Sequence, residues 1–239
     1  MRYKCILAGV GEIGKAVKEV FGQYHDIFPY DTNGGYDLPK GHFDILLVCF
    51  PWQENFVDIV NAYRNLHHIK ATIIFSTVPI GTTRQIPDAV HCPIEGVHPK
   101  LADGMRIWQF MMGGFNRMAV RFFHESNMCC ELMQTPEHTE IAKLASTTLY
   151  GMNIEFARYI NEICKANNVP YDTINKYNKN YNSLYCTMQM PQYSRYILKP
   201  PEGRKGGHCI NNNAKILQSQ YPNTFNEIVL SDEMEETHE

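Results

Sequence analysis

Seven short apolar runs in the N-terminal half most constrain what this chain can fold into. They are continuously apolar, rich in Ile, Leu, Val and Cys, instead of alternating between apolar and polar residues. Such runs suit strands buried on both faces of a parallel sheet. Helix-length segments separate them, among them 58–66 and 118–126, which predicts a doubly wound α/β domain. The expected strands are Tyr3–Ala8, Asp26–Tyr30, Asp44–Phe50, Thr72–Ser76, Val90–Ile94, Phe110–Met112 and Cys129–Met133.

The pattern changes after residue 136. Apolar residues from Ile141 to Ile163 recur at steps of three and four without an internal proline, which predicts one long helix over Glu137–Asn167. A final helix is expected at Asn213–Gln220. The sequence therefore predicts a sheet domain at 1–136, a smaller all-α domain at 137–230 for substrate binding and dimerisation, and an acidic tail at 231–239.

Composition excludes several classes of protein. A net charge of −3 over 239 residues gives no basic surface for nucleic acid. No apolar run approaches the roughly 20 residues that span a bilayer, and the N-terminus does not resemble a secretory signal. The eight cysteines are irregularly spaced and include no CxxC pair. We therefore expect a cytoplasmic protein with no disulfide framework and no metal site, whose partner is a small-molecule substrate.

The first motif follows the first expected strand and opens a helix: Gly9-Val10-Gly11-Glu12-Ile13-Gly14. In a dinucleotide-binding loop the first glycine permits the turn, the second lets the backbone approach a pyrophosphate, and the third allows close packing of helix on strand. The helix N-terminus then binds the phosphates. Alone, the motif is equally consistent with a tight turn.

Asp31 stands at the end of the next expected strand, where such a domain carries an acid. A carboxylate there accepts hydrogen bonds from the ribose hydroxyls and repels a 2′-phosphate. Strand, glycine turn, helix and acid in this order favour a Rossmann-type domain that binds NAD in preference to NADP.

Two further loops follow expected strands. Ser76-Thr77-Val78-Pro79-Ile80-Gly81-Thr82-Thr83 places two hydroxyls, on Ser76 and Thr77, where ligands bind such sheets. A plain strand-to-helix turn explains it equally well. Phe50-Pro51 is a similar loop, which we expect to wall the cofactor.

Gly206-Gly207-His208-Cys209-Ile210 is the third motif. Two glycines allow close backbone approach, and a thiol near the start of a helix is easily ionised. A loop with an incidental thiol is the alternative.

Taken in order, four elements of the chain resemble the signatures of the UDP-glucose/GDP-mannose dehydrogenase family, within the 6-phosphogluconate dehydrogenase-like superfamily. They are Gly9–Gly14, Ser76–Thr83, Glu140–Leu144 and Gly206–Ile210. Two more segments are similar to the family's long central helix and to a loop that follows a strand: Asn153–Cys164, and Cys92–Glu95 with its acid displaced by one position.

The resemblance implies oxidation of an alcohol to a carboxylate in two NAD-dependent hydride transfers, through a thioester on a cysteine. It implies that Cys209 is the nucleophile, that Lys143 stabilises negative charge on the substrate oxygen, and that Thr77 lies near the water and the transferred hydride. Candidate substrate contacts are Glu95, His98, Lys100, Asn153 and Gly207.

The chain also departs from the family pattern. The family's asparagine one turn after the lysine is Thr147 here, and the aspartate four residues after the cysteine is Asn213. An amide cannot accept a proton as a carboxylate does, which weakens acid–base help at that step. From the length of the sequence we also expect no counterpart of the family's C-terminal domain for the nucleotide sugar.

Two alternatives remain open. Gly96-Val97-His98-Pro99-Lys100 resembles the histidine–proline loop of prephenate dehydrogenases, in which the histidine binds the hydroxyl that loses hydride. The departures from the family pattern also fit a non-catalytic NAD-binding protein. In either case we expect a homodimer through the 137–167 helix, because one small domain hardly covers its apolar surface.

Overall fold

The computed structural model describes residues 1–96, 99–201 and 208–234. It divides into two compact units, Met1–Lys143 and Leu144–Glu239, and the division falls within one long helix.

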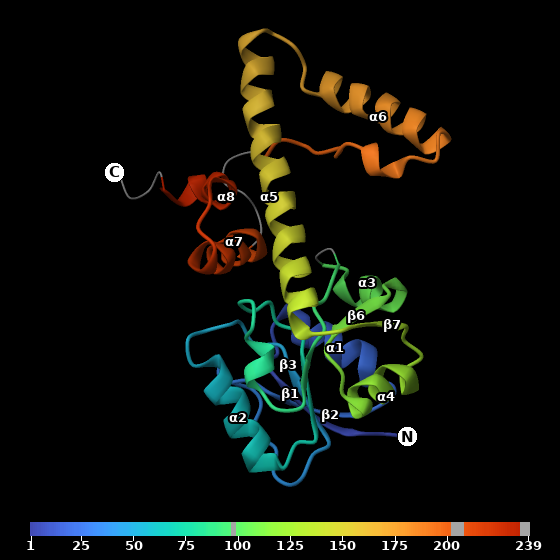
Figure 1. The fold of residues 1–239 in the computed structure, drawn as a ribbon, viewed down its shortest axis with the longest axis vertical. Helices are drawn as coiled ribbons and strands as arrows, with labels where there is room; N and C mark the ends of the chain where they lie inside the picture. The colour runs from blue at the N-terminus through green and yellow to red at the C-terminus, as the bar shows by residue number, and fades with distance from the viewer. Residues whose placement is uncertain (97–98, 202–207, 235–239) are drawn as a thin grey trace. The chain divides into compact units, whose positions relative to one another are not determined.

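The first unit is built on seven strands, which are β1 (Lys4–Ala8), β2 (Asp26–Tyr30), β3 (Ile45–Val48), β4 (Ala71–Ile74), β5 (Ala89–His91), β6 (Phe110–Gly113) and β7 (Cys130–Met133). They form one sheet in the order β2-β1-β3-β4-β5-β6-β7 (Figure 1). Neighbouring strands run parallel, except that β5 and β6 meet antiparallel at a single residue pair, His91 and Gly113. The predicted doubly wound α/β fold is confirmed, with one antiparallel step.

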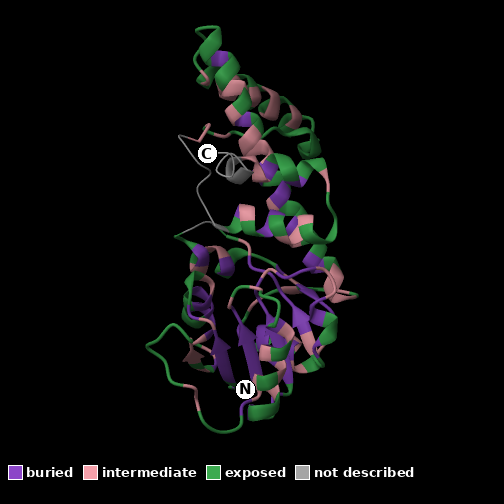
Figure 2. Cartoon of the chain, turned by 90° about the vertical axis from the view of Figure 1, so that its left-hand side faces the viewer, coloured by how far each residue is buried: buried purple, intermediate pink, exposed green. Residues whose placement is uncertain are grey.

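Alternate residues of each central strand enter two separate cores, one on each face of the sheet. Cys5 and Leu7 of β1 point into one core, and Ile6 and Ala8 into the other. Each of these four side chains is buried, as continuously apolar strands require. Figure 2 shows the strands of this unit among its most buried parts.

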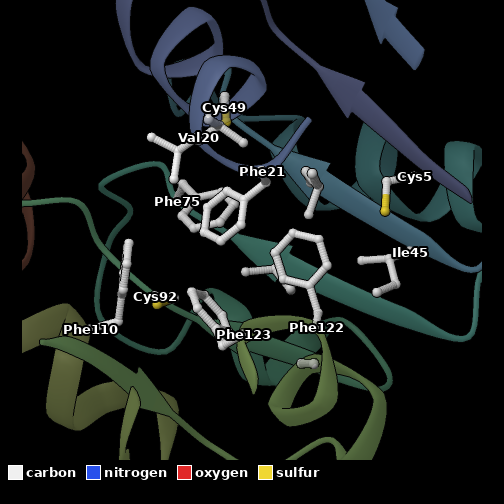
Figure 3. Close-up of a cluster of buried hydrophobic side chains, with 14 of the residues drawn as sticks. Cys5, Val20, Phe21, Ile45, Cys49, Phe75, Cys92, Phe110, Phe122 and Phe123 are labelled. Atoms are coloured by element: carbon white, nitrogen blue, oxygen red, sulfur yellow. The ribbon is translucent and has the colours of Figure 1, made fainter. Parts of the chain in front are cut away.

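Five phenylalanines fill the larger core (Figure 3). The ring centroids of Phe21 and Phe122 lie 4.7 Å apart, and those of Phe110 and Phe123 lie 4.9 Å apart. These separations are typical of favourable aromatic pairs. Phe75, directly after β4, completes the set and anchors the end of that strand beside the loop that follows it.

Helices cover both faces of the sheet. The larger core packs against α1, α3 and α4, and the smaller core against α2. Strand β5 ends three residues earlier than predicted, and Pro93 close behind has no N–H to continue a ladder. A short helix within 92–109 was not predicted. The elements are α1 (Glu12–Phe21), α2 (Phe56–His67), a 3₁₀ turn η1 (Thr83–Gln85), α3 (Leu101–Ile107) and α4 (Arg117–Glu125).

The long helix α5 (Pro136–Ala166) matches its prediction closely, and its C-terminal part belongs to the second unit. The other elements of that unit are α6 (Asp172–Thr187), a 3₁₀ turn η2 (Pro191–Tyr193), α7 (His208–Gln220) and α8 (Thr224–Met234). Helix α7 begins five residues before the predicted start, and α8 was not predicted. Since α8 runs to Met234, the expected solvated tail overlaps its last turn.

Helix α6 is held by polar contacts, and none of its side chains is buried. Asn175, Asn178 and Asn182 lie along one side of it and donate side-chain hydrogen bonds of 2.8–3.2 Å to backbone carbonyls of residues 195–198. The extended segment therefore runs back beside the helix (Figure 1). This explains the asparagine-rich composition, which masked the helix in the sequence.

Helices α7 and α8 pack closely on α5 at Gly151. A Cβ atom at Gly151 would lie 2.7 Å from Ile210 and 2.9 Å from Val229. Ile210, Ala214 and Val229 form the small buried core of this unit. Over the described ranges, the structure contains no helix long and apolar enough to cross a membrane.

Candidate functional site

Five loops of the first unit emerge at one edge of the sheet. Because β1 to β5 are mutually parallel, the segments that follow their carboxyl ends lie along the same edge. In the sheet, β1 lies between β2 and β3. The chain adds β2 on one side of β1 and then crosses to add β3 on the other side, so the strand order reverses between β1 and β3. Ligands of open α/β sheets bind at such a switch point.

The glycine loop lies at this point, and its three glycines have different surroundings. Gly9 has φ +92°, and a Cβ there would lie 2.6 Å from Phe50 N. A Cβ at Gly14 would lie 2.0 Å from Gly9 O. A Cβ at Gly11 would meet no protein atom within 4 Å. The fold itself therefore needs Gly9 and Gly14, whereas Gly11 leaves open space at the N-terminus of α1.

The residues between the glycines hold the loop in place. Val10 is buried, and Ile13 packs against the larger core. Glu12 is exposed and is the first residue of α1. The N-cap position of this helix is Gly11, which has no side chain to cap it. The first-turn N–H groups of a helix have no intrahelical partner, which suits an anion.

Asp31 joins the end of β2 to the glycine loop. Val10 N donates to Asp31 Oδ2 at 2.7 Å, and Asn33 N donates to Oδ1 at 2.8 Å. These two bonds lower the pKa of the Asp31 carboxyl, so it is ionised at neutral pH. Each carboxylate oxygen can accept more than one hydrogen bond. Asp31 can therefore still accept hydrogen bonds from the hydroxyls of a ribose.

A shallow hollow of about 480 Å³ adjoins Asp31. It is lined by residues 30–32 and 34–38. Within it, Asp31 and Tyr36 form an antiparallel bridge, and Lys18 Nζ lies 5.6 Å from the centroid of the Tyr36 ring. The hollow lies on the β2 side of the glycine loop, where a Rossmann-type domain receives the adenosine end.

On the other side of the switch point, Phe50 and Pro51 follow β3. Phe50 is half-buried, with its ring centroid 4.8 Å from that of Phe56, and Pro51 is exposed. Part of Phe50 and the whole of Pro51 thus remain accessible at this edge of the sheet, and their role as a wall of the cofactor site stays a prediction.

The next loop begins at Ser76, whose hydroxyl is used within the protein. Ser76 Oγ donates to Phe50 O at 2.7 Å, and Ser76 O lies 3.2 Å from Nε2 of the buried His91. A carbonyl only accepts, so Nε2 carries the proton and Nδ1 accepts from Thr139 Oγ1 at 2.8 Å. Of the expected hydroxyl pair, Ser76 is buried, and Thr77, directly after it, is partly exposed.

Glu140 closes the far end of this loop, and sequence reasoning gave it no role. Its side chain is fully buried, and its two oxygens accept Gly81 N at 2.6 Å and Thr83 N at 2.9 Å. Burial raises the pKa of the Glu140 carboxyl, and the bonds from Thr83 and Gly81 oppose that rise. Arg84 pairs with Glu137 on the same helix. The sequence signal that could have identified Glu140 is an acid at one of the positions of α5 that face the core.

Lys143 lies one turn further along α5, at the edge where β5 ends. Its Nζ donates to Ile94 O at 2.7 Å and to Glu95 Oε1 at 3.3 Å. The Lys143 side chain is only 15% exposed. Two residues that the sequence assigned separately, to catalysis and to substrate binding, are thus brought together, and the ammonium is fixed in orientation.

In the second unit, the two positions that depart from the family pattern bond to each other. Asn213 Nδ2 donates to Thr147 Oγ1 at 3.0 Å, and Asn213 is buried. Cys209 is exposed in the first turn of α7, as expected. Asn153 donates back to Leu149 O at 2.7 Å within α5, so part of its amide serves the helix.

The remaining candidates are less defined. Lys100 is exposed at the N-terminus of α3. His98 and Gly207 lie outside the described residues. In the described parts of the chain, His, Cys, Asp and Glu side chains form no group of three or more that could hold a metal ion.

Comparison with known proteins gives the fold relatives of this chain. No protein-family profile matches the sequence, and no curated protein matches it. Among solved structures, it is similar to UDP-D-ManNAc dehydrogenase from Pyrococcus horikoshii (15% identity, TM-score 0.75, covering 97% of this chain and 68% of the other). It is also similar to a UDP-glucose dehydrogenase from Pyrobaculum islandicum (13% identity, TM-score 0.72, covering 98% and 68%).

A third similar structure is closer to this chain in length. It is 3-hydroxyisobutyrate dehydrogenase from Mycobacterium tuberculosis, with 9% identity and a TM-score of 0.67, covering 100% of this chain and 95% of the other. At these identities the likenesses establish the fold.

Proposed function

We propose that this chain is an NAD-dependent dehydrogenase that oxidises a CH–OH group. The observation that carries the proposal is the open space at Gly11, at the N-terminus of α1 and beside the ionised Asp31. A pyrophosphate approaches a helix N-terminus most closely at a position without a Cβ, and no contact among the described residues requires a glycine there.

The described residues fit NAD. First-turn amides of α1 bind the pyrophosphate, Asp31 accepts the ribose hydroxyls, and the hollow bounded by Tyr36 receives the adenosine end. The negative charge of Asp31 disfavours a 2′-phosphate, which selects NAD over NADP. When bound, the nicotinamide supplies the hydride acceptor.

Lys143 acts on the substrate oxygen in this proposal. Oxidation of an alcohol places negative charge on that oxygen as its proton leaves, and a preorganised ammonium in a largely buried position stabilises the charge. The bonds to Ile94 O and Glu95 hold Lys143 ready at the edge where β5 ends. Thr77 contributes the hydroxyl nearest to the nicotinamide end.

Two substrate classes remain, and different observations favour them. The motifs around Lys143 and Cys209 favour a sugar or sugar nucleotide, oxidised through a thioester on Cys209. The likeness in fold to a hydroxyisobutyrate dehydrogenase favours a small hydroxy acid and a single hydride transfer. The neutral Thr147–Asn213 pair supports the second class, because neither side chain is a general base for thioester hydrolysis.

The test is NAD⁺ reduction, followed at 340 nm over a panel of sugar nucleotides, sugars and hydroxy acids. With an active substrate, Lys143→Met should lower kcat by about 100-fold or more. The matched control is Lys70→Met, an exposed lysine paired with Asp44. Equal loss in both variants, or full activity in Lys143→Met, would remove the catalytic role of Lys143.

Cys209 separates the two substrate classes. Cys209→Ser should stop carboxylate formation if a thioester is made, and should leave a single hydride transfer intact. Cys186→Ser, at the other exposed helical cysteine, is the control and should behave as the wild type. Absence of NAD⁺ reduction across the whole panel, together with NAD⁺ binding, would favour the non-catalytic alternative.

We also propose that the chain forms a homodimer through α5. Leu149, Phe156, Tyr159 and Ile163 lie on this helix at spacings of seven, three and four, and all are more than 40% exposed. An exposed apolar stripe of this kind is typical of a helix that packs against another. Sedimentation should give a dimer at micromolar concentration, and Phe156→Glu should give a folded monomer; a monomeric wild type contradicts the proposal.

A further inference from the structure

We propose that Glu140 is a positioning residue that holds the loop of residues 76–83 (the Thr77 loop) against the nicotinamide end of the cofactor. This inference rests on the proposed function. We infer that the buried Glu140 carboxylate fixes the distance between the Thr77 loop and α5, the helix that carries Lys143.

The contacts of Glu140 reach across the sheet edge to a loop almost sixty residues earlier in the chain. Gly81 N donates to Oε2 at 2.6 Å, and Thr83 N donates to Oε1 at 2.9 Å. The side chain has no solvent exposure. Burying a carboxylate away from water raises the free energy of the folded state unless its oxygens accept hydrogen bonds. The two bonds from the loop therefore make the burial of Glu140 possible.

A carboxylate suits this place better than an amide of the same shape. Both partners are N–H donors, so both side-chain oxygens must accept. Gly81 has φ +87°, a backbone conformation that turns the loop and brings the Gly81 and Thr83 amides to the same carboxyl group. In glutamine one acceptor becomes an NH₂ group, and one of the two loop amides would then face a second donor.

The other end of the loop is fixed independently. Ser76 is bonded through its hydroxyl to Phe50 O and through its carbonyl to His91 Nε2. The segment between these anchors begins at Thr77, whose neighbours Ser76 and Val78 are buried while Thr77 itself is partly exposed. With both ends fastened, Thr77 is presented at the carboxyl edge of β4 in one position.

The same turn of α5 holds the proposed reactive group. Lys143 follows Glu140 by three residues and is itself bonded to Ile94 O and Glu95. Residues three apart lie on one side of a helix. Glu140 therefore couples the Thr77 loop to the helix face that presents Lys143. The adenosine end is elsewhere, because Gly11 lies at the switch point and Asp31 lies on its β2 side.

The experiment compares ligands that do and do not carry a nicotinamide. ADP-ribose reports the adenosine end alone, by calorimetry. NADH reports the nicotinamide end through the enhancement of its fluorescence on binding. The variants are Glu140→Gln, Glu140→Asp and the control Glu131→Gln, an exposed glutamate on β7.

We expect Glu140→Gln to bind ADP-ribose as the wild type does and to lose most of the NADH fluorescence enhancement. Its affinity for NAD⁺ should fall towards its affinity for ADP-ribose. Glu140→Asp keeps both acceptor oxygens on a shorter side chain and should retain part of the enhancement. Glu131→Gln should match the wild type in all three measurements.

If Glu140→Gln enhances NADH fluorescence as strongly as the wild type does, the positioning role is overturned and the proposed function stands. If a folded Glu140→Gln loses ADP-ribose binding and NADH binding equally, Glu140 is merely structural, and the positioning role is again overturned. If Glu140→Gln does not fold, Glu140→Asp decides, and full wild-type enhancement there overturns the role. A wild-type protein that binds neither ligand overturns the proposed function and this inference together.

Discussion

His91 makes the free energy of unfolding of the first unit fall in acid, and the substitution His91→Gln isolates this effect. Its ring is fully buried, with Nε2 donating to Ser76 O and Nδ1 accepting from Thr139. Burial, with a further contribution from the nearby positive charge of Lys143, lowers the pKa of His91 to about 3. Glutamine at this position keeps an N–H that reaches towards Ser76 O and does not titrate between pH 3 and 8.

The sign and size of the effect follow from the two pKa values. An unfolded histidine has a pKa of about 6.5, so between pH 6.5 and 3 the unfolded chain binds a proton that the native state does not. The stability that His91 contributes is therefore complete above pH 6.5 and is lost as the pH falls towards 3. The loss is about 1.4 kcal/mol per pH unit, or about 2 kcal/mol at pH 5.

The assay is urea unfolding of the wild type and His91→Gln at pH values from 8 to 5. Both tryptophans, Trp52 and Trp108, belong to the first unit, so their fluorescence reports its unfolding. His25, the other buried histidine with a lowered pKa, is present in both proteins and cancels. The free-energy difference between the two proteins should be constant above pH 7 and fall by about 2 kcal/mol at pH 5. A constant difference down to pH 5 refutes the reasoning.

Three further predictions concern packing, and each is measured by urea unfolding. Gly14→Ala should lose about 3 kcal/mol or more, because its Cβ meets Gly9 O at 2.0 Å; a loss below about 1 kcal/mol contradicts the close packing of α1 on β1. Gly151→Ala should lose about 1–3 kcal/mol from the second unit through contact with Ile210, and a neutral result would mean that α7 packs elsewhere. Asn182→Ala removes two bonds to Arg195 and should cost about 1 kcal/mol and speed proteolysis within 194–200; unchanged proteolysis argues against the asparagine contacts.

The strands and the long helix were predictable because burial dictates their composition. Strand β3 is continuously apolar, and Ile45 to Val48 are all buried, as expected for a strand covered on both faces of a sheet. Helix α6 was missed because its contacts are polar: Asn178 and its neighbours bind a backbone, and no apolar period marks the helix. Likewise, β6 meets β5 antiparallel through one residue pair, and no local pattern encodes the direction of a strand.

At the candidate site, the sequence identified residue types but not their partners. The hydroxyl of Ser76 was expected to face a ligand, yet it donates to Phe50 O inside the protein. Glu140 was passed over because a lone acid in a helix is usually solvated, and its two amide partners lie almost sixty residues away. The pairing of Lys143 with Glu95 is equally non-local. Such contacts depend on which strands are neighbours, which the fold decides.

Calorimetric titration of NAD⁺ into the wild type and Gly11→Ala tests the central claim most directly. A methyl group at Gly11 touches no protein atom, so the two proteins should unfold at the same urea concentration. We predict one NAD⁺ bound per wild-type chain, tighter than NADP⁺, and at least about tenfold weaker binding to Gly11→Ala, which corresponds to about 1.4 kcal/mol. Equal binding of NAD⁺ to both proteins, or no binding to the wild type, would contradict the account.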